Sequence, residues 1–233
     1  MKTTKTFYSI YNSVINESQT YIEQLGQSQG RVVIYPGRFQ PMLPHHAKVY
    51  NRLRAQNPDS EVYIATSDKV EPNESPFNFE EKRSIISQLY NIPQDKILQM
   101  KSPYNGEEYS KYFDEYKTVL SLAVGEKDMK ESPRFKFDNI DPVSKLNMKK
   151  RGDGPSYLQP ESALLNNPQP LSTAAYIITA PTVTSGGAVA SASNFRKELR
   201  EVNDPEQYLK NMFGDKVKPV MDLIISKITD TNE

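Results

Sequence analysis

The chain lacks cysteine and tryptophan altogether and has only two histidines among its 233 residues. Without cysteine there is neither a disulfide framework nor a thiolate nucleophile, and the composition suits a reducing compartment. The 29 basic and 29 acidic residues cancel, so no global field attracts nucleic acid or a membrane surface. No apolar run reaches the roughly 20 residues of a membrane span, and the start lacks a signal-peptide core. We therefore expect a soluble, cytoplasmic protein with neither a membrane nor a nucleic-acid partner.

Short apolar runs rich in β-branched residues alternate with helical patterns along the chain. Strands are predicted at 31–35, 61–67, 95–100, 116–125 and 174–181. Between them, the sequence predicts helices from Pro44 to residue 56 and over 78–90, with acidic residues in the first turn of the second helix. This alternation predicts an α/β fold, a Rossmann-like parallel sheet with helices on both faces.

The two ends of the chain read differently from this middle part. Residues 1–30 form a predicted helical extension, 31–200 the α/β domain, and 201–233 helices that pack on the core. The strand and helix pattern dissolves from residue 128 to 170, and so long a stretch is usually functional or disordered. Residues 129–160 suit a mobile lid that reaches phosphate or a solvated loop, and Tyr157 within them is a candidate for stacking on a base.

Both histidines, His45 and His46, stand side by side where the first predicted strand gives way to a helix. Ligands of open parallel sheets bind where strands end and helices begin. A helix N-terminus offers free N–H groups to phosphate, imidazoles donate to its oxygens, and Arg38 adds a planar fork of donors. The same residues also suit a plain surface turn with two exposed histidines, and spacing alone does not decide between the two.

The turn itself has a familiar form. The segment "GRFQPMLPHH" (37–46) resembles the signature G-x-F-x-P-x-H-x-G-H of the nucleotidylyltransferase superfamily, which includes nicotinamide-mononucleotide, phosphopantetheine and glycerol-phosphate nucleotidylyltransferases. Gly37, Phe39, Pro41 and His46 match without gaps. The motif is degenerate, because a leucine at 43 stands in place of the first histidine and a histidine at 45 in place of the glycine.

A second segment supports the resemblance. The stretch "ASASNFR" (190–196) is similar to the late I-S-S-T-x-x-R element of the same superfamily, with Ser191, Ser193 and Arg196 in register. The segment "SPFNFEEKRSII" (75–86) resembles the N-P-F-x-x-x-E-R helix start. The resemblance covers about residues 31–200, and the wording of both motifs is nearest the nicotinamide-mononucleotide branch.

The resemblance implies an enzyme that transfers a nucleotidyl group from ATP or CTP, with Mg²⁺, to a phosphate-bearing acceptor, releasing pyrophosphate. It implies no metal held by side chains alone. His46 and Arg196 would be the catalytic residues, the first at the α- and β-phosphates and the second on the triphosphate. The residues implied in nucleotide binding are Gly37, Arg38, Phe39, His45, Ser191 and Ser193.

The departures from the motif favour a second hypothesis, a catalytically retired member of the fold that serves as a structural or interaction protein. The side chain of leucine at 43 cannot donate a hydrogen bond. An imidazole at 45, where the motif has a glycine, narrows the site for the base of the nucleotide. The opening 17 residues also loosely resemble capsid-targeting segments of bacteriophage head proteins, which are cut after a triplet of the form "INE" (15–17). On that hypothesis the protein is encoded by a phage, lies in the host cytoplasm or the virion, and has capsid proteins or a second copy as partners.

Overall fold

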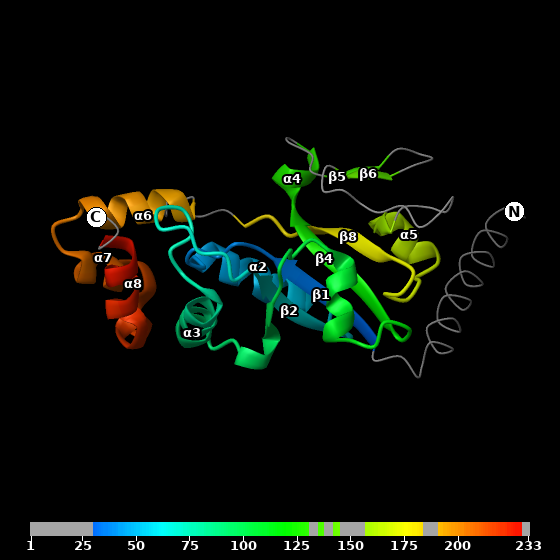
Figure 1. Cartoon of the computed structure of the whole chain (residues 1–233), viewed down its shortest axis with the longest axis horizontal. Helices are drawn as coiled ribbons and strands as arrows, with labels where there is room; N and C mark the ends of the chain where they lie inside the picture. The colour runs from blue at the N-terminus through cyan, green and yellow to red at the C-terminus, as the bar shows by residue number, and fades with distance from the viewer. Residues whose placement is uncertain (1–29, 131–134, 138–141, 145–156, 184–190, 230–233) are drawn as a thin grey trace, which may run out of the picture.

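The computed structural model describes residues 30–130, 135–137, 142–144, 157–183 and 191–229 (Figure 1). Its centre is a six-stranded, all-parallel sheet in the order β3-β2-β1-β4-β8-β7. The strands are β1 (Gly30–Pro36), β2 (Ser60–Thr66), β3 (Ile97–Gln99), β4 (Thr118–Gly125), β7 (Leu158–Pro160) and β8 (Ala175–Ala180). The predicted Rossmann-like α/β fold is confirmed.

Burial on both faces explains why the central strands are apolar almost throughout. In β1, Val33 and Tyr35 point into one apolar cluster, whereas Val32 and Ile34 point into another on the opposite face. Side chains alternate along a strand, so a strand covered on both sides needs apolar residues at every position. The strand β4 is likewise buried up to Val124, and its two polar residues, Thr118 and Ser121, are buried with the apolar ones.

Helices and loops cover the two faces of the sheet. The first face packs against α2 (Pro44–Gln56), α3 (Phe79–Tyr90) and α5 (Glu161–Asn166). The second packs against the segment around the 3₁₀ helix η2 (Gly106–Lys111), where the Tyr109 ring is fully buried. The predicted helix starts hold: Pro44 is the first residue of α2, and Asn78 caps α3 by accepting from Glu81 N at 2.9 Å.

The C-terminal helices gather at one end of the molecule, beside α3 (Figure 1). They are α6 (Ala192–Glu201), α7 (Pro205–Phe213), the 3₁₀ helix η3 (Gly214–Val220) and α8 (Met221–Thr229). Their apolar faces share one cluster with Ile85 and Leu89 of α3. Since Leu43 at the start of α2 belongs to the same cluster, these helices brace the turn that precedes α2.

The stretch that we expected to lack structure contains more than a loop. It holds α4 (Glu126–Lys130), β7, α5 and a small antiparallel pair, β5 (Phe135–Phe137) and β6 (Pro142–Ser144). The extension at 1–29 and much of the range 129–160, which suited a lid, lie outside the described residues. Within those that are described, no helix has the length and apolar character to cross a membrane.

Candidate functional site

The strand order of the sheet reverses between β1 and β4: β2 and β3 lie on one side of β1, and β4, β8 and β7 lie on the other. A cavity of about 610 Å³ opens there at the carboxyl ends of the strands. Neighbouring connections leave a parallel sheet in opposite directions at such a point, which creates a crevice for ligands. His45 and His46 line it from α2, and Tyr35, Gly125 and Ala180 line it from the ends of β1, β4 and β8. The two histidines therefore face the crevice where the sequence placed a site.

His46 is held in one tautomer. Its Nδ1 accepts a hydrogen bond from the backbone N–H of Leu43 at 3.0 Å. Burial, together with the neighbouring His45, lowers the pKa of His46 to about 3. The ring is therefore neutral at physiological pH and carries its hydrogen on Nε2. A neutral imidazole with its Nδ1 already occupied offers the cavity one oriented donor, which suits an oxygen that gains negative charge.

His45 fills space that a glycine would leave open. Its ring centroid lies 4.0 Å from that of His46, and both rings border the same cavity. Partial burial and Lys48 lower the pKa of His45 as well. The side chain thus occupies part of the crevice beside the His46 ring.

Gly37 and Phe39 shape the turn beneath His46. Phe39 has a positive φ of 46°, and its ring contacts the His46 ring edge-on at a centroid distance of 5.6 Å. A Cβ at Gly37 would lie 2.5–2.9 Å from three atoms of the Phe39 ring. The glycine is therefore required because the aromatic ring folds back over it. Neither residue borders the cavity, but the Phe39 ring contacts two residues that do, His46 and Tyr35.

Two buried polar side chains, those of Gln40 and Arg196, join the same turn to other segments by hydrogen bonds. The Gln40 amide donates to Phe77 O and accepts from Phe77 N, both at 2.9 Å. The guanidinium of Arg196, only 6% exposed, donates to Gln40 O at 2.6 Å and to Asn73 O at 3.2 Å. Arg196 therefore joins the β1–α2 turn to the loop before α3, a structural role that the sequence did not predict.

A positive region surrounds this clamp. Burial is the main cause of a lowered pKa at Arg196, and the nearby charges of Arg200 and Arg38 lower it further. Arg38 itself is exposed on the turn, and its carbonyl accepts from Thr66 Oγ1 at 3.1 Å. The charge of Glu74 acts on the pKa of Arg196 in the opposite direction. Arg38 is thus the exposed guanidinium of the turn, whereas Arg196 lies on α6, and neither side chain lines the cavity.

The serines of the late motif lie at the start of α6. Ser191 is the N-cap residue, and its Oγ accepts from Asn194 N at 3.1 Å. Ser193 is exposed, and its Oγ lies 3.5 Å from Nη2 of Arg196. Capping accounts for the first serine without a ligand, whereas the second stands next to the arginine that the motif implicates.

Leu43 does not face the cavity. It is 1% exposed and packs with Phe77 and Phe195 against the C-terminal helices. The position where the motif has its first histidine is thus part of the apolar core here. Tyr157 is likewise buried, with its hydroxyl bonded to Leu171 O at 2.7 Å, so the prediction that it stacks on a base is wrong.

Several groups at this edge were not singled out from the sequence. The cavity is also bordered by Glu126, whose carboxylate accepts from Thr182 Oγ1 at 2.8 Å. Asp128 lines it too. At the base of the turn, buried Lys82 donates to Thr66 Oγ1 at 3.2 Å and to Ser67 O. Burial lowers the pKa of Lys82 to about 8.

A second hollow of about 580 Å³ opens at the carboxyl ends of β2 and β3. Lys69, Lys101 and Lys111 border it together with Asp68 and Tyr112. Lys69 pairs with Glu71 at 2.6 Å, and Lys111 donates to Gln99 O at 2.8 Å. Three ammonium groups against one carboxylate give this hollow a positive lining, in contrast to the cavity by the histidines.

No protein-family model matches the chain, and no curated protein matches it. Among solved structures, nicotinic acid mononucleotide adenylyltransferase from Plasmodium falciparum, complexed with NaAD, is 18% identical with a TM-score of 0.48, over 88% of this chain and 97% of that one. A bifunctional NMN adenylyltransferase/ADP ribose pyrophosphatase from Francisella tularensis, complexed with AMP and a manganese ion, is 14% identical with a TM-score of 0.35, over 85% of this chain and 52% of that one.

These similar structures are adenylyltransferases of the branch that the two sequence motifs resemble. At such identities and TM-scores they bear on neither the substrate nor the activity of this chain.

Proposed function

We propose that the carboxyl edge of the sheet binds a nucleoside triphosphate and transfers its nucleotidyl group to a phosphate-bearing acceptor. The observation that carries this proposal is His46. It lines the crevice at the switch point of the sheet, and the Leu43 N–H fixes it as a neutral ring whose Nε2–H is its only donor. A surface turn with two exposed histidines, the plain alternative, would not bury one ring and lock its tautomer.

The chemistry of the edge suggests how a substrate would lie on it. Glu126 and Asp128 line the cavity and accept hydrogen bonds, which suits the hydroxyl groups of a ribose. The guanidinium groups of Arg38 and Arg196 stand outside the cavity at the turn, where they suit the triphosphate. The lysine-lined hollow at the ends of β2 and β3 suits the phosphate of the acceptor.

In the proposed reaction, an oxygen of the acceptor phosphate attacks the α-phosphorus of ATP or CTP. A new phosphorus–oxygen bond forms as the bond to the bridging oxygen breaks, and pyrophosphate leaves with the electron pair. The Nε2–H of His46 would donate to the phosphate oxygens as that charge grows. Among the described residues no group of three histidine, aspartate or glutamate side chains could hold a metal, so Mg²⁺ would arrive on the triphosphate.

A retired member of the fold is the second candidate, and three observations favour it. Leu43 is part of the apolar core, so the turn has lost one donor. His45 occupies part of the crevice. Arg196 already bonds two backbone carbonyls, which leaves fewer of its donors for phosphate. Such a protein would keep the sheet and the turn while serving as a structural or interaction protein.

Turnover separates the two candidates. The purified protein is incubated with ATP or CTP, Mg²⁺ and either nicotinamide mononucleotide or nicotinic acid mononucleotide, and pyrophosphate and dinucleotide are measured. Equal amounts of both products would support transfer. His46→Ala should then lower kcat on the order of 10²–10³-fold, because the oriented Nε2–H donor is lost. His45→Ala, the matched control on the adjacent residue, should change KM rather than kcat.

The opposite result is equally informative. Absence of pyrophosphate with every acceptor, from a protein that stays folded under the assay conditions, would contradict transfer and favour the retired fold. Equal loss of kcat in the two histidine variants would contradict the specific role of His46.

A further inference from the structure

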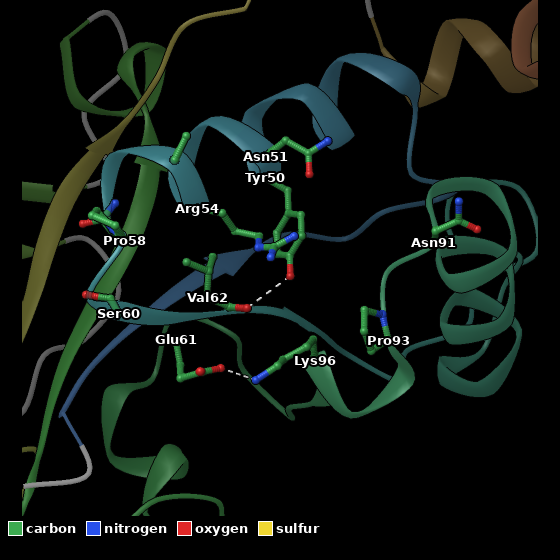
Figure 2. Close-up of a pocket in the computed structure, with 12 residues that line it drawn as sticks. Tyr50, Asn51, Arg54, Pro58, Ser60, Glu61, Val62, Asn91, Pro93 and Lys96 are labelled. Carbon is green, nitrogen blue, oxygen red and sulfur yellow. Dashed lines mark hydrogen bonds and ion pairs between the residues drawn. The ribbon is translucent and has the colours of Figure 1, made fainter.

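A separate cavity of about 660 Å³ lies at the other end of α2 from the two histidines (Figure 2). Its walls are the last turns of α2, the start of β2 and the segment from Asn91 to Lys96 that leads into β3. Arg54 lies eight residues after His46, which corresponds to about 12 Å along the helix. The volume lies within the range of small-molecule sites, roughly 300–1,000 Å³.

Several polar groups of this cavity are already engaged with neighbours. The hydroxyl of Tyr50 donates to Val62 O at 3.2 Å, and Lys96 pairs with Glu61, as the dashed lines of Figure 2 show. The amide nitrogen of Asn57 donates to Leu53 O at 2.8 Å, which leaves its side-chain oxygen as an acceptor.

Arg54 differs from these residues. Its guanidinium has no hydrogen bond or ion pair with any residue in the described part of the chain, and it extends from α2 past the Tyr50 ring toward β2 (Figure 2). Burial is the main cause of a raised pKa at Tyr50; the charges of Arg54 and Lys96 oppose that rise, and the charges of Glu61 and Asp95 add to it. Both cations therefore stand close to the phenol at the floor of the cavity.

The charge of the lining is positive. Its charged side chains are Arg54 and Lys96 against Glu61, two cations and one carboxylate. Since Glu61 pairs with Lys96, Arg54 is the charged residue of this lining that has no ion pair among the described residues. A guanidinium presents a planar fork that matches the oxygens of a phosphate or carboxylate. Beside it, Ser60 at the start of β2 adds its hydroxyl and Asn57 of the preceding loop adds its side-chain oxygen, which suit sugar hydroxyls.

We propose that this cavity is a binding site for a small sugar phosphate, with Arg54 as the partner of the phosphate group. Asn57 and Ser60 would contact the hydroxyl groups of the sugar, and the prolines at 58 and 93 would form rigid walls of the cavity. The site is distinct from the crevice by the histidines and does not depend on any activity there.

The test is a titration of the isotopically labelled full chain followed by NMR, with ribose 5-phosphate as the probe. The Arg54 Nε–H and the Asn57 side-chain amide should shift with saturation, at a Kd on the order of 1 mM, the affinity expected of one charge-assisted contact and a few neutral ones. Arg54→Gln should weaken binding about tenfold or more. Arg83→Gln is the matched control, because Arg83 lies on α3 outside the cavity and pairs with Glu80. It should leave the affinity unchanged.

Three results would overturn the proposal. The first is the absence of saturable shifts at these groups with ribose 5-phosphate on the order of 10 mM, well above the expected Kd. The second is equal affinity in Arg54→Gln and the unsubstituted protein. The third is a set of shifts confined to the crevice and abolished by His46→Gln. Titrations with inorganic phosphate and with free ribose test the phosphate and the sugar of the ligand separately. Each should bind more weakly than ribose 5-phosphate. If either one binds as tightly as ribose 5-phosphate, the ligand is not a sugar phosphate.

Discussion

The buried, neutral state of His46 makes the stability of this protein depend on pH in a way that can be calculated. In the unfolded chain a histidine titrates near its ordinary pKa of about 6.5, whereas in the folded protein the pKa of His46 is lowered to about 3. Between these values the unfolded chain binds a proton that the folded protein does not bind. The contribution of His46 is therefore fully present above pH 6.5 and is lost as the pH falls toward 3.

The size of the effect follows from the two pKa values. Lowering the pH from 7 to 4.5 should reduce the free energy of unfolding by about 2.5 kcal/mol through His46 alone. His46→Gln removes this titration while the other ionisable groups stay the same. We therefore expect the stability advantage of the unsubstituted protein over His46→Gln to shrink by about 2.5 kcal/mol between these two pH values.

Urea denaturation of both proteins at pH 7 and 4.5, followed by circular dichroism, measures this difference. Ring nitrogen chemical shifts of His46 at pH 7 report the tautomer directly, and the hydrogen should be on Nε2. A difference that stays constant with pH would refute the lowered pKa that burial and His45 cause, and a hydrogen found on Nδ1 would refute the contact with the Leu43 N–H.

Three further substitutions probe the turn. Gly37→Ala should lower the stability by about 1–3 kcal/mol, because its Cβ would collide with the Phe39 ring, whereas Gly125→Ala, whose Cβ would meet its nearest atom at 3.8 Å, should be nearly neutral in the same thermal melt. Gln40→Leu leaves a buried backbone N–H and C=O without partners and should cost about 2–4 kcal/mol in urea denaturation; a cost below 1 kcal/mol would show that water replaces the amide. Arg196→Met should lower stability by about 3 kcal/mol and abolish ATP binding in calorimetry at a temperature where the variant is folded; unchanged binding would remove this arginine from the triphosphate site.

Local signals predicted most of the sheet and its helices. The apolar run of β1, Pro44 at the first position of α2 and the acidic first turn of α3 are each specified within a few residues, which is why their sequence patterns were sufficient. The position of His45 and His46 at a strand-to-helix junction followed from the same reasoning, since strand ends meet at one edge of a parallel sheet.

Local sequence patterns did not predict the contacts between segments that are far apart along the chain. Arg196 donates to the carbonyl of Gln40, 156 residues earlier, and Gln40 clamps Phe77, 37 residues later. The residues that flank each partner contain no pattern that indicates either hydrogen bond. The strand β7 and the helix α5 were missed for a different reason: each is short, and both lie within polar sequence whose composition resembles a loop.

The central claim is that the crevice at His46 binds a nucleoside triphosphate. Calorimetric titration of the full chain with ATP, then CTP, each with Mg²⁺, tests it most directly when repeated with His46→Ala. The account predicts saturable binding of at least one nucleotide and weaker binding in the variant, because the oriented Nε2–H donor is gone. Absence of binding to both nucleotides, or equal affinity in the variant, would contradict it and leave a Rossmann-like scaffold whose partners are proteins.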